Sequence, residues 1–220
     1  MGSKRSFQQV LILVTAAMAL CLISGAALFQ VLRIPDALEI LTKEQPTTGN
    51  RQAQVEVVVF EDFLCSECLQ FNETIFPQIE EKYIGTNEIR YTLIPVSFID
   101  HSKPIANAAL AVYKLAPTRF FAYAHALFRY FGENRADSDT GVLLKIADEV
   151  GEISQKELLK AIQTEQYYPE LDQNLYLAKR LMGTDFGTPA LYVNGIATPT
   201  GSFRSVQVRI DRALYMVGKK

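Results

Sequence analysis

Tryptophan is absent from this chain of 220 residues, and histidine and cysteine are scarce, with two and three copies. Ten tyrosines and thirteen phenylalanines must therefore supply the large side chains of the core. The formal charge is only −2, so the composition gives no electrostatic case for binding nucleic acid. No segment repeats at a fixed period. The length suits one domain, or one domain that carries an insertion.

The shortage of cysteine and histidine also limits metal binding. Cys65 and Cys68 are three residues apart, a spacing found both in redox pairs and in half of a zinc site. Structural zinc needs four ligands, but Cys21 lies in an apolar stretch and His101 and His125 are far apart. We therefore expect a redox pair with no metal and no cofactor. Structural zinc and an inert pair of buried cysteines are the alternatives.

A long uncharged run follows a short basic N-terminus. Lys4 and Arg5 precede residues 10–29, none of which is charged. About twenty apolar residues can span a bilayer, whereas a cleaved signal has an apolar region of about 7–15 residues. The apolar character continues to about residue 32, which favours an uncleaved anchor over 10–32, with cleavage after Ala26 as the alternative. Either outcome would export the rest of the chain.

The residues around the two cysteines predict a strand followed by a helix. β-branched residues dominate 55–60, which is typical of a buried strand. Apolar residues at helical spacing follow the cysteines, so we expect Cys65 at a helix N-terminus, where the helix dipole favours a thiolate. Pro77 predicts a kink or break in this helix. A second strand is expected over 89–96.

The second half of the chain is helical and then returns to strands. Ser102 is expected to cap the first helix, and Ser154 has the spacing of a capping box with Glu157. Further helices are expected over 120–131, 141–150, 154–162, 169–181 and 204–217, with strands over 190–193 and 196–199 around an Asn194–Gly195 turn. Two halves of a small α/β unit thus flank an all-helical insertion.

Two motifs, with the helical insertion between them, resemble the DsbA-like exported thiol–disulfide oxidoreductases of the thioredoxin superfamily. The first is Phe60–Phe71, which holds the cysteine pair, and the second is Gly187–Gly195, which is similar to the cis-proline loop and its hairpin. The resemblance implies a cis bond before Pro189, opposite the cysteines. It also implies that the backbone of Thr188 can pair with an extended substrate segment. The alternative is that Pro189 merely starts a strand.

The resemblance also implies an α/β thioredoxin fold with an inserted helical subdomain, behind an N-terminal anchor or signal segment. We expect the anchor or signal over residues 1–33, a polar linker over 34–53 and the DsbA-like domain over 54–220. The helical insertion is expected over about 102–182.

The dipeptide between the cysteines departs from the pattern of the strongest oxidants in this family. Ser66 and Glu67 stand where the best-known DsbA enzymes have proline and histidine. A carboxylate that points inward from Glu67 should oppose a thiolate on Cys65. We therefore expect these two residues to tune the redox pair toward a milder oxidant.

Acidic residues lie near the end of the first strand. Val59 occupies the position at which thioredoxins and DsbA enzymes often place a buried acid. Glu61 and Asp62 are nearer the cysteines and are candidates for a proton relay, although Asp62 is equally suited to cap the helix.

By this resemblance the chain introduces disulfides into exported proteins or peptides, through a mixed disulfide on Cys65, with Cys68 buried. A quinone-linked membrane protein, DsbB-like or VKOR-like, would reoxidise the pair. The expected location is the bacterial cell envelope, on the extracytoplasmic face of the inner membrane, as a monomer. The alternatives are a reductase or isomerase on the same scaffold, or a binding module without catalysis.

Overall fold

The computed structural model describes residues 13–22, 24, 38–134 and 139–218. The chain divides into two compact units, 1–36 and 37–220. In the first unit, residues 13–22 and 24 are helical. No helix in the described ranges is long and apolar enough to cross a membrane. The rest of the expected anchor over 10–32, and the alternative cleavage site after Ala26, lie outside the described residues.

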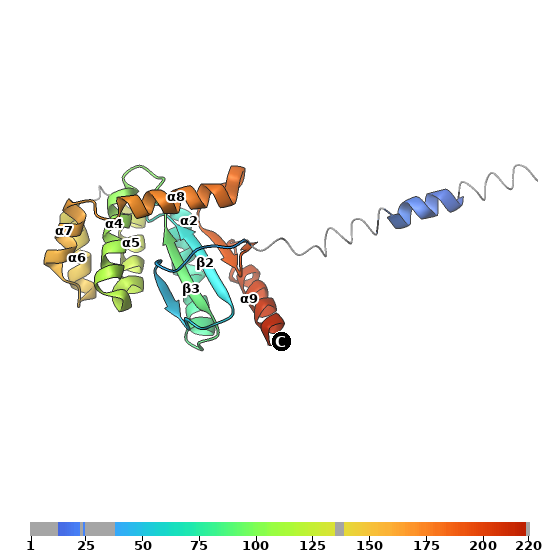
Figure 1. The fold of residues 1–220 in the computed structure, drawn as a ribbon, viewed down its shortest axis with the longest axis horizontal. Helices are drawn as coiled ribbons and strands as arrows, with labels where there is room; N and C mark the ends of the chain where they lie inside the picture. Colours follow the sequence, from blue (N-terminus) through green and yellow to red (C-terminus); the bar gives the residue numbers. More distant parts are fainter. Residues whose placement is uncertain (1–12, 23, 25–37, 135–138, 219–220) are drawn as a thin grey trace, which may run out of the picture. The chain divides into compact units, whose positions relative to one another are not determined.

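A five-stranded sheet of order β1-β3-β2-β4-β5 lies at the centre of the second unit (Figure 1). The central strand β2 runs parallel to β3 and antiparallel to β4, and both outer pairs are antiparallel. The strands are β1 (Thr47–Gly49), β2 (Glu56–Glu61), β3 (Arg90–Pro95), β4 (Ala190–Val193) and β5 (Ile196–Thr198). The four strands expected from the apolar patterns are confirmed.

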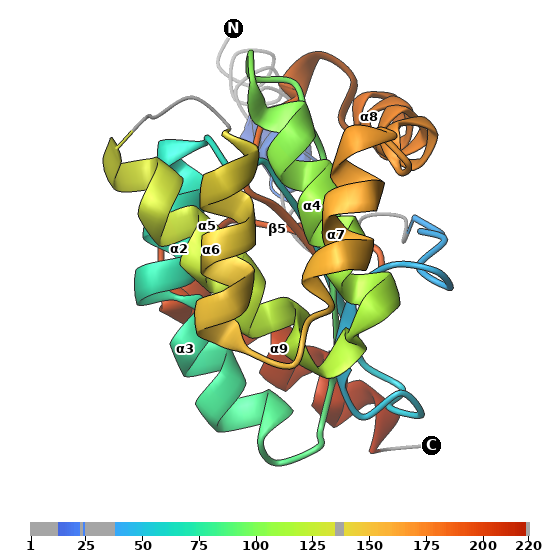
Figure 2. The ribbon, with the colours of Figure 1, turned by 90° about the vertical axis from the view of Figure 1, so that its left-hand side faces the viewer.

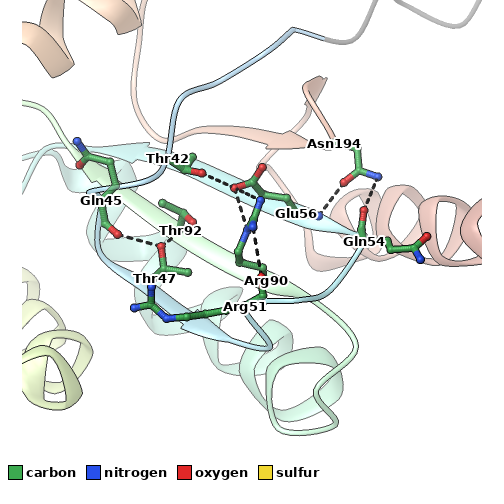
Figure 3. Close-up of polar contacts among 9 residues, drawn as sticks. All are labelled: Thr42, Gln45, Thr47, Arg51, Gln54, Glu56, Arg90, Thr92 and Asn194. Carbon is green, nitrogen blue, oxygen red and sulfur yellow. Dashed lines mark hydrogen bonds and ion pairs between the residues drawn. The ribbon is translucent and has the colours of Figure 1, made fainter.

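The prediction of a linker over 34–53 is wrong for β1, which is the edge strand beside β3. Its residues are two threonines and a glycine, so no apolar alternation marks it as a strand. The Thr47 hydroxyl lies 3.0 Å from that of Thr92 on β3 (Figure 3). Pairing with the open edge of β3, which the sequence pattern does not reveal, makes this segment part of the sheet.

A cluster of polar side chains connects the segment around β1 to the first residues of β2 and β3 (Figure 3). The Glu56 carboxylate accepts a hydrogen bond from the Thr42 hydroxyl at 2.7 Å and pairs with the Arg90 guanidinium at 3.0 Å. The side-chain oxygen of Asn194 accepts from the Glu56 N–H at 2.7 Å, and its amide donates to the Gln54 carbonyl at 3.3 Å. Thr42, Arg90 and Asn194, which are distant in the sequence, therefore all bond to Glu56.

The described part of the second unit contains eight α-helices. The bounds are α2 (Ser66–Thr74), α3 (Phe76–Ile79), α4 (Ser102–Leu115), α5 (Phe120–Asn134), α6 (Thr140–Val150), α7 (Gln155–Gln163), α8 (Tyr168–Met182) and α9 (Phe203–Val217). A π-helix over Glu80–Ile84 and 3-10 turns over Pro117–Arg119 and Gly183–Asp185 complete the helical segments.

Alternation along β2 divides the core into two clusters. Val57 and Val59 pack with α2, α9 and the helical block, whereas Val58 and Phe60 pack with α8. Figure 2 shows α4, α5, α6 and α7 grouped together, which confirms the expected all-helical insertion. The insertion is expected to end near residue 182, so its range includes α8. This helix also covers one face of the sheet.

Two local predictions about helix ends need correction. Ser154 is the N-cap residue of α7, but its side chain makes no capping hydrogen bond. The break predicted at Pro77 falls at Ile75, which ends α2 and begins α3. The proline lies inside the first turn of α3, where it displaces no helical hydrogen bond.

We expect Phe128→Ala to destabilise the protein by about 3–5 kcal/mol. The rings of Phe63 and Phe128 are fully buried with centroids 4.6 Å apart, so this pair joins the cysteine loop to α5. Denaturant unfolding of the purified protein measures the change. Tyr176→Ala, at an exposed site on α8, is the control and should alter stability by less than about 0.5 kcal/mol. Equal losses in both variants would contradict the assignment of Phe128 to the core.

Candidate active site

The two cysteines lie at the start of α2, where the central strand β2 delivers the chain. Cys65 is the N-cap residue and Cys68 is in the first turn, which confirms the expected helix end. Both are free thiols. Cys65 keeps 6% of its surface exposed, whereas Cys68 keeps none. An incoming group can therefore reach Cys65 but not Cys68.

The loop before β4 lies against the cysteine pair because β2 and β4 are neighbours. Phe60, near the end of β2, pairs with Ala190, the first residue of β4. The loop that follows β2 and the loop that precedes β4 therefore lie next to each other. The Thr188–Pro189 bond is cis, as the resemblance implies. The Thr188 carbonyl accepts a hydrogen bond from the Cys65 sulfur at 3.3 Å.

The hydrogen bond from the Cys68 thiol is the main cause that lowers the pKa of Cys65 to about 7. Burial opposes it, and the Thr188 side chain and the Cys68 N–H assist it. Burial raises the pKa of Cys68 well above its usual range, and its bond to Cys65 adds to the rise. The two thiols therefore differ strongly, with Cys65 the one that ionises near neutral pH.

The Glu67 carboxylate lies close to the Cys65 sulfur, which is the orientation in which we expect it to oppose a thiolate. One carboxylate oxygen accepts from the Ser66 hydroxyl at 2.9 Å and from the Cys65 thiol at 3.4 Å. The bond from Ser66 is the main cause that lowers the pKa of Glu67. The contact with Glu67 favours the protonated form of Cys65 and raises the pKa of that thiol.

Glu61 is a fully buried acid behind the cysteines. It shares a face of β2 with Val59, two residues earlier, and so lies on the same side of the sheet as that position. Burial raises the pKa of Glu61 well above its ordinary range, although a hydrogen bond from Asn72 at 2.7 Å opposes the rise. The Glu61 charge also raises the pKa of Cys68.

Two neighbours of Glu61 carry no sequence signal for this role. Asn72 on α2 donates both to Glu61 and to the Cys68 carbonyl, the latter at 3.0 Å. Tyr91 on β3 is fully buried, and burial, followed by the charges of Glu61 and Cys68, raises the pKa of Tyr91. The Tyr91 hydroxyl and one Glu61 oxygen lack a hydrogen-bond partner within the described residues. The packing of α2 on the sheet brings Asn72 to Glu61, and the pairing of β3 with β2 places Tyr91 on the same side of the sheet.

Asp62 is a structural anchor whose side-chain oxygens are bonded to four donors near the cysteine loop and the loop after β3. It accepts hydrogen bonds from the N–H groups of Leu64, Phe98 and Ile99 and from the Ser102 hydroxyl, at 2.9 to 3.1 Å. The prediction that Ser102 caps α4 is wrong, because its hydroxyl is used here and His101 is the N-cap residue. The suggestion that Asp62 caps the cysteine helix is also wrong, since Cys65 occupies that position.

A cleft of about 570 Å³ opens beside the Cys65 sulfur. It is lined by Leu64, Cys65, Ser66, Glu67, Phe98, Ile99, Asp100, His101, Gly187 and Thr188. The segment after β3 forms one side of the cleft. Asp62 holds this segment in place, because its carboxylate accepts hydrogen bonds from the N–H groups of Phe98 and Ile99. The described residues contain no group of three or more His, Cys, Asp or Glu placed to hold a metal ion.

The sequence matches a known family over most of its length. The family model for thioredoxin covers residues 41–211. The chain belongs to the thioredoxin family. Disulfide bond formation protein D of Bacillus subtilis is 30% identical over 156 residues, which are 69% of this chain and 68% of that protein. A Rickettsia typhi protein named as a putative protein-disulfide oxidoreductase is 28% identical over 166 residues, or 76% of this chain.

Solved structures place this thioredoxin-family chain with the DsbA-like proteins. The crystal structure of Chlamydia trachomatis DsbA superposes with a TM-score of 0.74 at 28% identity, over 83% of this chain and 98% of that one. Oxidised BdbD from Bacillus subtilis superposes with a TM-score of 0.71 at 25% identity, over 81% and 97%. The chain spans only 60% of the length of the Rickettsia typhi relative.

We expect Glu67→Gln in this DsbA-like protein to lower the pKa of Cys65 below about 7. The variant removes a charged acceptor that favours the protonated thiol, so the thiolate forms at lower pH. The ultraviolet absorbance of the thiolate, followed against pH in the reduced protein, measures the change. Glu73→Gln, which removes an exposed charge from the same helix, is the control. A higher pKa in Glu67→Gln would show that the carboxylate stabilises the thiolate instead.

Proposed function

We propose that this protein is an exported thiol–disulfide oxidoreductase that introduces disulfides into secreted or envelope proteins. The observation that carries the proposal is the Cys65 thiol at the start of α2, hydrogen-bonded to the carbonyl before a cis-proline. Its pKa of about 7 allows Cys65 to leave as a thiolate when a mixed disulfide is resolved, and the adjoining cleft gives a substrate segment a place to bind. The relatives named as a disulfide bond formation protein and as a putative protein-disulfide oxidoreductase support the same chemistry.

The reaction begins from a Cys65–Cys68 disulfide. A substrate thiolate attacks the Cys65 sulfur, a substrate–Cys65 disulfide forms, and Cys68 leaves with the electron pair as a thiolate. A second substrate thiolate then attacks the substrate sulfur of that mixed disulfide and expels Cys65. The substrate loses two electrons and gains a disulfide, and the two cysteines end as thiols. Burial of Cys68 directs the first attack to Cys65.

Glu61 is the group we assign to proton transfer at Cys68. A buried thiolate is unstable, so Cys68 must take a proton as it leaves and give one up when the pair is reoxidised. Burial raises the pKa of Glu61, which brings this carboxyl nearer to the working pH of a proton donor and acceptor. Asp62 has its oxygens committed to four donors and is not assigned to the relay.

Thr188 and Pro189 serve as the substrate platform in this proposal. An extended substrate segment pairs with the backbone of Thr188 and so presents its cysteine to Cys65. Reoxidation of the monomeric enzyme would require a quinone-linked membrane protein, DsbB-like or VKOR-like. The apolar run over 10–32 supports a location at the extracytoplasmic face of the bacterial inner membrane.

A disulfide reductase or isomerase is the second candidate, and Glu67 is the observation that favours it. A less stabilised thiolate on Cys65 makes the pair a weaker oxidant. The reduction potential against glutathione separates the two functions. A mild oxidase should lie between DsbA, at about −120 mV, and thioredoxin, at about −270 mV. A value at the thioredoxin end would favour the reductase.

Replacement of the cysteines tests the proposed function directly. Cys65→Ser should reduce the oxidation of a dithiol peptide by about three orders of magnitude or more, because the attacked sulfur is lost. Cys68→Ala treated with oxidised glutathione should instead keep a mixed disulfide on Cys65: the Cys65 thiolate attacks the glutathione disulfide, one glutathione leaves as a thiolate, and no Cys68 thiol is present to release the other. The adduct is detected as a mass increase that reducing agents reverse. Cys21→Ser is the matched control and should keep full activity. Undiminished oxidation by Cys65→Ser, or no trapped adduct with Cys68→Ala, would favour a binding module.

Glu61→Gln tests the proton relay at the step in which Cys68 attacks a mixed disulfide on Cys65. Gln keeps an oxygen that can accept from Asn72, so the fold should be retained. With a glutathione adduct on Cys65, release of glutathione at neutral pH should slow by about 100-fold and recover as the pH rises. Glu61→Asp should restore part of the rate. An unchanged rate at neutral pH in Glu61→Gln would remove Glu61 from the relay.

A further inference from the structure

The cleft beside Cys65 carries negative charge on two of its sides. Glu67 enters from α2 and Asp100 from the segment between β3 and α4, and both side chains are exposed. None of the residues that line the cleft is Lys or Arg, and His101 is the one lining side chain that can become a cation. The chain as a whole is nearly neutral, so this imbalance is local to the site.

The two carboxylates lie where a bound peptide would meet them. Glu67 is held by Ser66 and is only 3.4 Å from the Cys65 sulfur, so it borders the point at which a substrate cysteine arrives. Asp100 directly follows Phe98 and Ile99, whose backbone is fixed by Asp62. Both charges are therefore presented from anchored backbone.

The cleft also has an apolar side. Phe98 is 40% exposed and packs edge to face on Phe186, with ring centroids 5.1 Å apart. The Lys179 ammonium lies over the Phe186 ring, at 5.8 Å from its centroid, and neither residue lines the cleft. Leu64 and Ile99 extend the apolar surface. A peptide in the cleft thus meets an aromatic wall as well as two carboxylates.

We propose that the cleft selects cysteine-containing segments that carry Lys or Arg beside the cysteine and an apolar side chain for the Phe98 wall. The inference rests on the proposed function and names the class of substrate that it acts on. A substrate cation near Glu67 and Asp100 gains attraction, whereas an acidic segment is repelled from the same cleft. Because both carboxylates are exposed, the preference acts mainly on the rate of association and weakens with salt.

Glu67 links this selection to the chemistry. A cation bound to its carboxylate offsets the effect that favours the protonated Cys65 thiol. Cys65 is the leaving group when the second substrate thiolate resolves the mixed disulfide, and a more stable thiolate leaves faster. A basic substrate therefore binds faster and is released from the mixed disulfide faster than an acidic one.

The test uses the oxidised full-length protein and three dithiol peptides that differ only in the residues next to the cysteines, which are Lys, Gln or Glu. We expect rates of oxidation in the order Lys, Gln, Glu, with up to about a tenfold difference between the first and the last at low salt. High salt should narrow this difference. Equal rates for the three peptides at low salt would overturn the inference and leave the proposed function intact. Failure to oxidise any of them would overturn both.

Variants that remove a negative charge test whether Glu67 and Asp100 cause the preference for basic peptides. The ratio of the Lys rate to the Glu rate should fall in Asp100→Asn and in Glu67→Gln, and approach one in the double variant. The ratio is the readout because Glu67→Gln also changes Cys65 itself. Glu149→Gln removes the same charge from an exposed site on α6 and should leave the ratio unchanged. An unchanged ratio in the double variant would show that the preference, if present, arises outside the cleft, and would overturn the assignment.

Discussion

The pairing of β2 with β4 is the constraint on which the candidate active site depends. Phe60 and Ala190 lie opposite each other, so the loop that leaves β2 and the loop that enters β4 end at the same edge of the sheet. This register places Cys65 within hydrogen-bonding distance of the Thr188 carbonyl, although more than a hundred residues separate them in the chain. The cleft beside Cys65 is lined by residues of both loops, from Leu64 to Glu67 and from Gly187 to Thr188, together with the segment that follows β3.

The surroundings of Cys65 act on its thiolate in opposite directions. The Cys68 thiol stabilises the Cys65 thiolate, whereas burial and, to a smaller extent, the Glu67 carboxylate favour the protonated form. The resulting pKa of about 7 is close to that of thioredoxin and well above that of the strongest DsbA oxidants, at about 3.5. The same Glu67 carboxylate borders the cleft, so the residue we assign to a milder potential is also one we assign to the choice of substrate.

Adjacent acids in the chain have different surroundings because side chains alternate along a strand and its extension. Glu61 points into the core beneath Cys68, where burial raises its pKa and one of its oxygens lacks a partner in the described structure. Asp62 turns to the loop after β3 and is bonded to four donors there. Glu61 is the acid that we assign to proton transfer, whereas Asp62 fixes the segment that forms one side of the cleft.

The sequence by itself determined the elements with strong local patterns: the β-branched strand, the helix that begins at Cys65, the hairpin at Asn194–Gly195 and the helical insertion. Their signals are apolar periodicity and turn chemistry, which neighbouring residues encode. Only the tertiary structure decided that β1 joins the sheet, that the Ser102 hydroxyl bonds to Asp62 instead of capping α4, and that Asn72 donates a hydrogen bond to Glu61. These are polar contacts between segments far apart in the chain, and they depend on the register of the sheet and the packing of α2, which no local pattern contains.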